Sequence, residues 1–146
     1  MTRIRLAESG DEPWLRRLLQ RSLAEEYGPL DPEDFADEWH TRIGCGANVV
    51  WIADDTTGPI GFAWLIRLPD PLFRSGTYYL YYVAVEAAHR GQGVALALLQ
   101  HVRTALPGAI RLLVRCDSPA KRLYTRLGAH PWREEWVWPE QTLPGS

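Results

Sequence analysis

Near the middle of the chain, the hydrophobic pattern changes its period across a loop that contains two glycines. The run TYYLYYVAV at Thr77–Val85 is rich in aromatic and β-branched residues and predicts a strand. Gly91–Leu106 instead repeats its apolar residues every three to four positions, which predicts a helix. Gly91 and Gly93 stand where the strand gives way to the helix. A chain built around such a strand–loop–helix unit folds with helices packed on a sheet.

The remaining pattern predicts further elements on both sides of this unit. Apolar runs bounded by turn residues predict strands at 2–7, 48–54, 60–68, 109–115, 130–133 and 135–138. Amphipathic spacing predicts helices at 11–27, 32–43 and 117–127. We therefore expect an α/β (α+β) fold, with a mixed, mostly antiparallel sheet of six to seven strands flanked by four helices. A single domain is expected over residues 1–140, followed by a loose tail at 141–146.

Composition argues against several classes of protein. The formal net charge of −2 and the scattered arginines give no basic stripe for nucleic acid. The sequence begins without the apolar stretch of a signal peptide and has no apolar run long enough to span a membrane. Cys45 and Cys116 form neither a disulfide framework nor a metal-ligand pattern. We expect a cytoplasmic protein without a metal, a membrane segment or a nucleic-acid partner.

The glycine loop has a structure that suits a phosphate. The first N–H groups of a helix have no partner within the helix, and the helix dipole places partial positive charge there. A phosphate settles on these donors if no side chain blocks its approach. Gly91 and Gly93 remove that block, Ala95 is small, and Arg90 adds a cation. The alternative is a plain strand-to-helix turn that uses glycine only for its backbone geometry.

Two common nucleotide motifs do not fit this loop. A Walker-type loop needs a lysine followed by Ser or Thr, and neither follows Gly93. A dinucleotide fingerprint needs a small residue at position 96 and an acid about 20 residues after the loop. Leu96 and Arg111 stand there instead.

Two segments resemble the signatures of the GNAT superfamily of N-acetyltransferases. Arg90–Ala95 matches its pyrophosphate loop, Arg/Gln-x-x-Gly-x-Gly/Ala, and the preceding strand ends in the usual valine, Val85. The segment Asp117–Ala129 resembles a second signature, Asn-x-x-Ala-x-x-Leu-Tyr-x-x-x-Gly-Phe. Asp117 stands where the family often has Asn, and Ala129 where it often has Phe. The expected order of elements agrees with this family over essentially the whole chain.

The resemblance implies that acetyl-coenzyme A is the co-substrate. The pantetheine arm would lie along the strand edge and the pyrophosphate on the loop and helix start. The residues implied to bind acetyl-coenzyme A are Val83, Ala84, Val85, Arg90, Gly91, Gln92, Gly93, Val94, Ala95, Leu96, Asp117 and Tyr124. The backbone N–H of Val83 or Ala84 could stabilise the developing oxyanion.

The resemblance also implies a direct attack of an amine on the thioester. Tyr124 would be the general acid that protonates the departing sulfur, and the alternative is that it only packs on its helix face. Tyr79 and Tyr81, expected on the same side of the strand as Val83, would bind the acceptor or relay a proton through water; filling of the sheet is the alternative. The general base is unresolved. Glu86 is expected to be a solvated turn residue, and His89 is expected to lie in an exposed turn.

The acceptor and the assembly are less constrained. The acceptor implied is a primary amine of a small molecule, or the N-terminus or a lysine of a protein. A homodimer is plausible through the apolar end at 132–138. The alternative function is a non-catalytic module that binds acyl-coenzyme A and acts as a sensor or interaction domain.

Overall fold

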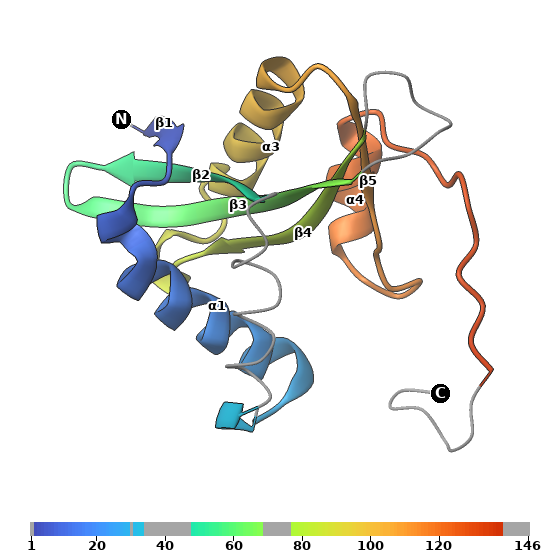
Figure 1. The fold of residues 1–146 in the computed structure, drawn as a ribbon, viewed down its shortest axis with the longest axis horizontal. Helices are drawn as coiled ribbons and strands as arrows, with labels where there is room; N and C mark the ends of the chain where they lie inside the picture. Colours follow the sequence, from blue (N-terminus) through green and yellow to red (C-terminus); the bar gives the residue numbers. More distant parts are fainter. Residues whose placement is uncertain (1, 30, 34–47, 69–76, 139–146) are drawn as a thin grey trace. The chain divides into compact units, whose positions relative to one another are not determined.

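The computed structural model describes residues 2–29, 31–33, 48–68 and 77–138. The chain divides into two compact units, Met1–Leu113 and Val114–Ser146. The first unit contains β1 (Arg3–Leu6), α1 (Glu12–Tyr27), β2 (Asn48–Asp55), β3 (Gly58–Leu68), β4 (Thr77–Val85), α3 (Val94–Ala105) and β5 (Ala109–Leu112) (Figure 1). Two short 3-10 turns, Ser9–Asp11 and Ala87–His89, precede α1 and α3. The second unit contains α4 (Ala120–Arg126).

The described strands form one sheet in the order β1-β2-β3-β4-β5. The first four are antiparallel neighbours, and β5 is parallel to β4 after the crossover through α3. The expected α+β class and the mixed, mostly antiparallel sheet are confirmed. The turn residues at 56–59 between two apolar runs predict a hairpin. That hairpin is present, since β2 and β3 pair on either side of a turn at Thr56 and Thr57.

Helix α1 covers one face of the sheet because its apolar residues fall on one side. Leu15, Leu18 and Leu19 are almost fully buried. They join one cluster with residues of β2, β3 and β4, namely Ile52, Phe62, Trp64 and Ala84. Trp14 packs edge-on against Phe62, with 6.1 Å between the ring centroids.

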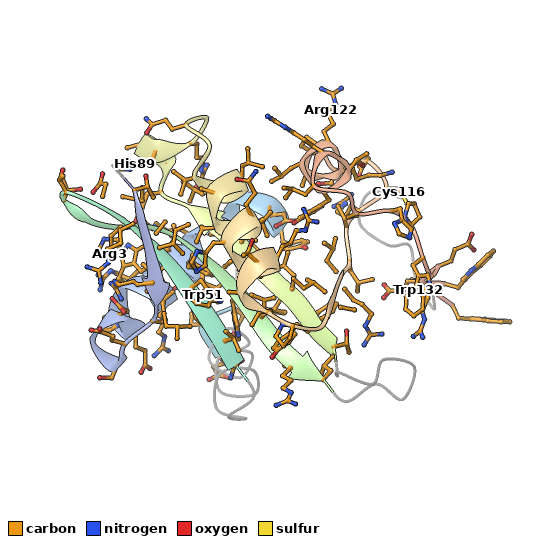
Figure 2. The ribbon with its side chains drawn as sticks, turned by 90° about the horizontal axis from the view of Figure 1, so that it is seen from above. Arg3, Trp51, His89, Cys116, Arg122 and Trp132 are labelled. Carbon is orange, nitrogen blue, oxygen red and sulfur yellow. The ribbon has the colours of Figure 1, made fainter. Side chains whose placement is uncertain are left out.

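Helix α3 lies on the opposite face of the sheet (Figure 1). Its buried residues are Val94, Leu98, Leu99 and Val102. Gly61, next to Phe62 in β3, faces this helix, and a Cβ atom at position 61 would lie 3.2 Å from Val94 Cγ1 and 3.0 Å from the carbonyl oxygen of Ala84. Trp51 of β2, labelled in Figure 2, packs edge-on against His101 of α3, with 4.5 Å between the ring centroids. The sheet is therefore covered on both faces.

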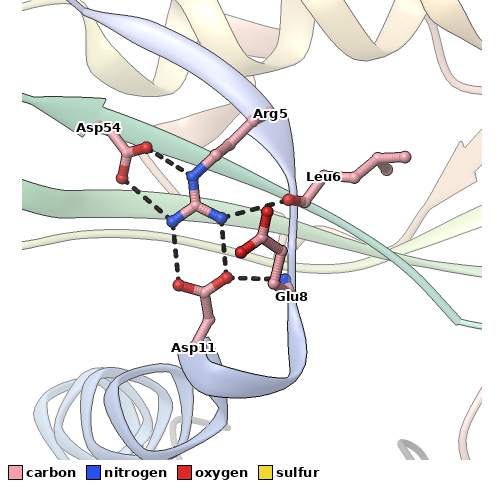
Figure 3. A network of polar contacts seen from close by, with 5 residues as sticks. All are labelled: Arg5, Leu6, Glu8, Asp11 and Asp54. Carbon is pink, nitrogen blue, oxygen red and sulfur yellow. Dashed lines mark hydrogen bonds and ion pairs between the residues drawn. The ribbon is translucent and has the colours of Figure 1, made fainter.

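An ionic network fixes the start of α1 against the sheet edge (Figure 3). Arg5 of β1 donates from Nε to Asp54 at 2.6 Å and from Nη1 to Asp11 at 2.8 Å. Asp11 also accepts the backbone N–H of Glu8 at 2.7 Å. Because hydrogen bonds from Arg5 stabilise its charged form, the pKa of Asp11 is lowered. Asp11 occupies the N-cap position of α1, but its side chain closes the preceding turn instead of capping the helix.

A register shift interrupts the alternation of β4. Trp64 of β3 pairs with Tyr82, whereas the next residue, Leu65, pairs with Leu80, so Tyr81 is left as a bulge. Directly paired residues share a face of the sheet. Tyr79, paired with Ile66, therefore lies on the α1 face, while Val83, paired with Ala63, lies on the α3 face. Our expectation that Tyr79 and Tyr81 share a side with Val83 is wrong, because it assumed an unbroken alternation.

The second unit contains α4, whose C-terminal end is closed by backbone bonds. Gly128 has a positive φ of 90° and donates to Thr125, while Ala129 donates to the carbonyl of Tyr124 at 3.0 Å. This is a Schellman motif, which the position of Gly128 predicted. Asp117 at the start of the predicted helix is a typical N-cap residue, and the sequence predicts that it caps the helix. In the structure the side chain of Ser118, and not that of Asp117, accepts the N–H of Ala120 at 3.2 Å.

The two strands expected at 130–133 and 135–138 are absent from the structure. These residues are described but belong to no helix or strand, and Trp136 and Trp138 are 84% and 98% exposed. A strand needs a neighbour for its backbone groups, and no described strand pairs with these residues. The helix expected at 32–43 lies outside the described residues beyond Glu33, as does the tail.

Candidate active site

Strand β4 leaves half of one edge without a strand partner in the described sheet. Strand β5 pairs with β4 only from Thr77 to Leu80. In an antiparallel pair, backbone groups face the partner strand and face away from it in alternation. The N–H of Glu86 donates to Ile60 of β3 at 2.8 Å, so the alternation directs the backbone groups of Val83 and Val85 away from β3. This open edge leads directly into the glycine loop.

The loop ends in a group of backbone N–H donors. Gly91 and Gly93 have φ angles of 76° and 81°, in the left-handed region that other residues rarely adopt. Helix α3 therefore begins at Val94, three residues later than expected. Its first backbone bond runs from the N–H of Ala97 to the carbonyl of Gly93 at 3.0 Å. The N–H groups of residues 94–96 precede that bond, and no atom of the other described residues lies within 4 Å of a Cβ position at Gly91 or Gly93.

Arg90 points back from this loop toward α1 and β4. Its Nε donates to the carbonyl of Val85 at 3.1 Å, and its Nη2 lies 2.8 Å from Glu25 Oε2. The guanidinium is about half exposed. The cation that the loop motif predicted is therefore present, next to the open strand edge and paired with a carboxylate of α1.

A cleft of about 320 Å³ lies between the end of α1 and the open part of β4. Its lining residues are Ser22, Glu25, Glu26, Tyr82, Val83, Ala84, Val85 and Arg90. The hydroxyl of Tyr82 donates to Glu26 Oε2 at 2.8 Å. Burial, together with the nearby carboxylate of Glu26, raises the pKa of Tyr82 well above its usual range, so this phenol remains a donor.

The α1 side of the cleft was missed by the sequence analysis. Ser22, Glu25 and Glu26 lie in a segment read only as an amphipathic helix, and Tyr82 had no assigned role. One available signal was the occurrence of two acids in the last turn of a helix, where basic residues are favoured.

Two polar residues near the loop are bound to other elements, contrary to expectation. Glu86 is not a solvated turn residue: it accepts from Trp14 Nε1 at 2.9 Å and from Arg21 Nη2 at 3.1 Å. His89 is labelled in Figure 2. Its Nε2 lies 3.0 Å from Asp55 Oδ2, and its Nδ1 is buried without a hydrogen-bond partner among the described residues. Hydrogen bonds from Thr57 lower the pKa of Asp55. These contacts anchor the turn before the glycine loop.

The other predicted site residues fall into two groups. Tyr81 packs edge-on against Trp64, with 4.4 Å between ring centroids, and lies with Tyr82 against the α1 core. Tyr124 and Asp117 belong to the second unit. Tyr124 is partly buried on α4, while the Asp117 side chain is 74% exposed and lies 3.3 Å from Arg115 Nε. In the described residues, no group of three or more His, Cys, Asp or Glu side chains could hold a metal, and no helix is long and apolar enough to cross a membrane.

The fold is shared with acetyltransferases of known structure. A possible acetyltransferase from Clostridium difficile 630 aligns with a TM-score of 0.81 and 13% identity, over 98% of this chain and 99% of that one. The ribosomal-protein-alanine N-acetyltransferase of Brucella melitensis aligns with a TM-score of 0.72 and 22% identity, over 97% of this chain and 100% of that one. AAC(6')-Iy, in complex with a bisubstrate analogue, aligns with a TM-score of 0.72 and 14% identity, over 97% and 99%. These likenesses define the class as a GNAT-like α+β fold.

The family follows from the sequence match. The sequence model described as Acetyltransferase (GNAT) family matches residues 15–129, which include the glycine loop and α4. No match is found among curated proteins. The chain belongs to the GNAT family of acetyltransferases and is an N-acetyltransferase-type enzyme.

Proposed function

We propose that this protein transfers an acetyl group from acetyl-coenzyme A to a primary amine, by direct attack of the amine on the thioester. The observation that carries the proposal is the continuity of the open β4 edge, Val83–Val85, with the glycine loop at the start of α3. An extended pantetheine arm can add to such an edge as a further strand would. The pyrophosphate then reaches the helix-initial N–H groups of residues 94–96.

The residues of the loop suit a pyrophosphate. The space beside Gly91 and Gly93 is open, so phosphate oxygens can approach the backbone closely. Gln92, Ala95 and Leu96 contribute backbone N–H groups around the same turn. Arg90 supplies a cation at the junction of strand and loop, once its pairing with Glu25 is exchanged for a phosphate.

The open edge also offers a donor for the reacting carbonyl. The alternation along β4 directs the N–H of Val83 outward and that of Ala84 toward β3. This favours Val83 over Ala84 as the donor that stabilises the oxyanion of the tetrahedral intermediate. Attack forms the C–N bond, collapse of the intermediate breaks the C–S bond, and the coenzyme A thiolate leaves.

The reaction also moves two protons, one onto the leaving sulfur and one away from the attacking amine. Tyr124 is the proposed donor to the departing sulfur, and Asp117 is proposed to lie beside the bound coenzyme. Tyr79 and Tyr81 share the α1 face of β4, and we assign them to the acceptor side. Two of the similar structures are named for an acceptor, one a protein and one a small molecule. The first is named for a ribosomal protein's alanine, and the second holds coenzyme A joined to an acetylneamine analogue.

The test is release of coenzyme A in the presence of a panel of amines, followed by mass spectrometry of the products. We expect acetylation of at least one amine and a rise in melting temperature with acetyl-coenzyme A. The panel contains small amines, amino acids and peptides with free N-termini or lysines. Stabilisation by acetyl-coenzyme A with no acetylation of any amine would favour the non-catalytic binding module instead.

A further inference from the structure

The C-terminal end of α1 carries two carboxylates where a helix least favours them. The last turn contains Glu25 and Glu26 and no basic residue. The helix dipole places partial negative charge at this end, so acids there are destabilising. Residues that break a local rule of this kind often serve a functional site. The two acids therefore indicate a role other than helix formation.

Both carboxylates line the cleft that borders the open edge of β4. The charged side chains that line the cleft are Glu25, Glu26 and Arg90. Arg90 pairs with Glu25 at 2.8 Å, which leaves the charge of Glu26 uncompensated among them. The cleft thus carries a net negative charge next to Val83, where the thioester is proposed to lie. A negative wall of this kind attracts a cation.

Glu26 is held in place without being neutralised. Its Oε2 accepts the hydroxyl of Tyr82 at 2.8 Å, and Tyr82 itself is fixed by packing against the α1 core. A neutral donor orients a carboxylate without adding a positive charge beside it. Among the described residues, the second carboxylate oxygen, Oε1, accepts no hydrogen bond. A positioned carboxylate of this kind suits an ammonium group.

A buried hydroxyl in the same cleft lacks a partner. Ser22, one turn before Glu26 on α1, lines the cleft and is only 8% exposed. Its Oγ is buried and makes no hydrogen bond within the described residues. A buried hydroxyl without a partner is unfavourable, and a ligand N–H group would satisfy it. This points, independently of the acids, to a polar ligand in the cleft.

We infer that the cleft selects an acceptor amine carrying a second positive charge, which Glu26 binds with the help of Glu25 and Ser22. The inference rests on the proposed acetyl transfer and specifies its substrate class, a small di- or polyamine. One amine, uncharged when it attacks, reaches the thioester beside Val83. The other remains an ammonium ion against the end of α1. When Arg90 turns to a bound pyrophosphate, Glu25 is released and the negative charge of the cleft increases.

The experiment compares two ligands of equal length, diaminobutane and aminobutanol, each with its functional groups at the two chain ends. Binding of each to the protein saturated with coenzyme A is measured by calorimetry, and kcat/KM with acetyl-coenzyme A is measured in parallel. We expect the wild type to bind the diamine about tenfold more tightly, as one charge-assisted hydrogen bond would give. Glu26→Gln should bring the ratio close to one, and Glu25→Gln should lower it less.

The matched control is Glu12→Gln, which removes the same charge from the other end of α1. This variant should keep the wild-type preference for the diamine. Equal binding of both ligands by the wild type, or an unchanged preference in both Glu25→Gln and Glu26→Gln, would overturn the inference. The binding arm decides this even if neither ligand is acetylated. A lack of turnover would count against the proposed function alone.

Discussion

At the scale of single residues, the two loop glycines are required by backbone geometry and not only by space. Both have a positive φ, and a Cβ atom at either position would meet no atom within 4 Å in the part of the chain that the structure describes. A side chain at Gly93 is therefore disfavoured by its own backbone strain, which is about 1–2 kcal/mol for most residues and less for Asn or Asp. The open space beside it is what a phosphate needs.

Gly93→Asp should abolish the rise in melting temperature that acetyl-coenzyme A produces. The carboxylate would lie at the helix start and repel the pyrophosphate. Gly93→Asn is the matched control, because it has nearly the same shape and tolerates the same backbone conformation without the charge. Thermal melts with and without acetyl-coenzyme A measure the effect. Unchanged stabilisation of a folded Gly93→Asp protein would contradict the assignment of this loop.

Tyr124→Phe should lower kcat by about tenfold to a few hundredfold, because the phenol is the proposed proton donor to the leaving sulfur. The effect lies toward the lower end because a thiolate, with a thiol pKa of about 8.5, already leaves readily. The free energy of unfolding should change by less than about 1 kcal/mol, since the ring is retained. Steady-state kinetics and urea denaturation test both parts. Wild-type turnover would return Tyr124 to a packing role.

At the scale of elements, the contact between β3 and α3 positions the helix start. Gly61 lies so close to Val94, the first residue of α3, that no side chain fits between them without a shift. The position of the α3 N–H donors relative to the open edge of β4 thus depends on the close contact between Gly61 and Val94. The sequence shows Gly61 only as a residue within an apolar strand, which does not reveal this contact.

Gly61→Ala should raise the KM for acetyl-coenzyme A and destabilise the fold by about 1–3 kcal/mol, as overpacking usually does. The added Cβ would lie 3.0 Å from the carbonyl oxygen of Ala84 and 3.2 Å from Val94 Cγ1, so the helix start has to move. Gly10→Ala is the control, because nothing lies within 4 Å of a Cβ at position 10. The KM for acetyl-coenzyme A and the free energy of unfolding are measured for both variants. Equal values in the two variants would show that Val94 and Ala84 move aside at no cost.

At the scale of the whole molecule, stability depends on pH through Asp11, which accepts hydrogen bonds from Arg5. The folded pKa of Asp11 lies below its unfolded value of about 3.9. The unfolded state therefore binds more protons between the two values. The stabilisation is complete above the unfolded pKa and is lost as the pH falls through the folded pKa.

Asp11→Asn should lower the free energy of unfolding by about 1.5–3 kcal/mol at neutral pH, as the loss of hydrogen bonds to a charged group does. The difference from wild type should shrink once the pH falls below about 3.9. Urea denaturation across this range measures it. Asp117→Asn is the control, since its side chain is 74% exposed and should leave the pH profile unchanged. A constant difference across the acid range would rule out Asp11 as the titrating group.

The sequence by itself determined the strand–loop–helix unit, the hairpin and the sheet class, because each depends on local periodicity and on glycines at fixed places. The bounds of β4 were predicted to the residue. The motif residues Arg90–Ala95 and Tyr124 were likewise visible, since a short motif keeps its residues together in the chain.

Only the tertiary structure decided which distant residues meet. Glu86 binds Trp14 72 positions away, and Tyr82 binds Glu26 56 positions away, so neither contact leaves a local pattern. The bulge at Tyr81 turns Tyr79 to the α1 face, although strict alternation would place it with Val83. A strand also exists only where a neighbour pairs with its backbone, and the apolar residues at 130–138 have none in the described structure. Periodicity reports which side chains prefer burial, whereas pairing and packing decide where they are buried.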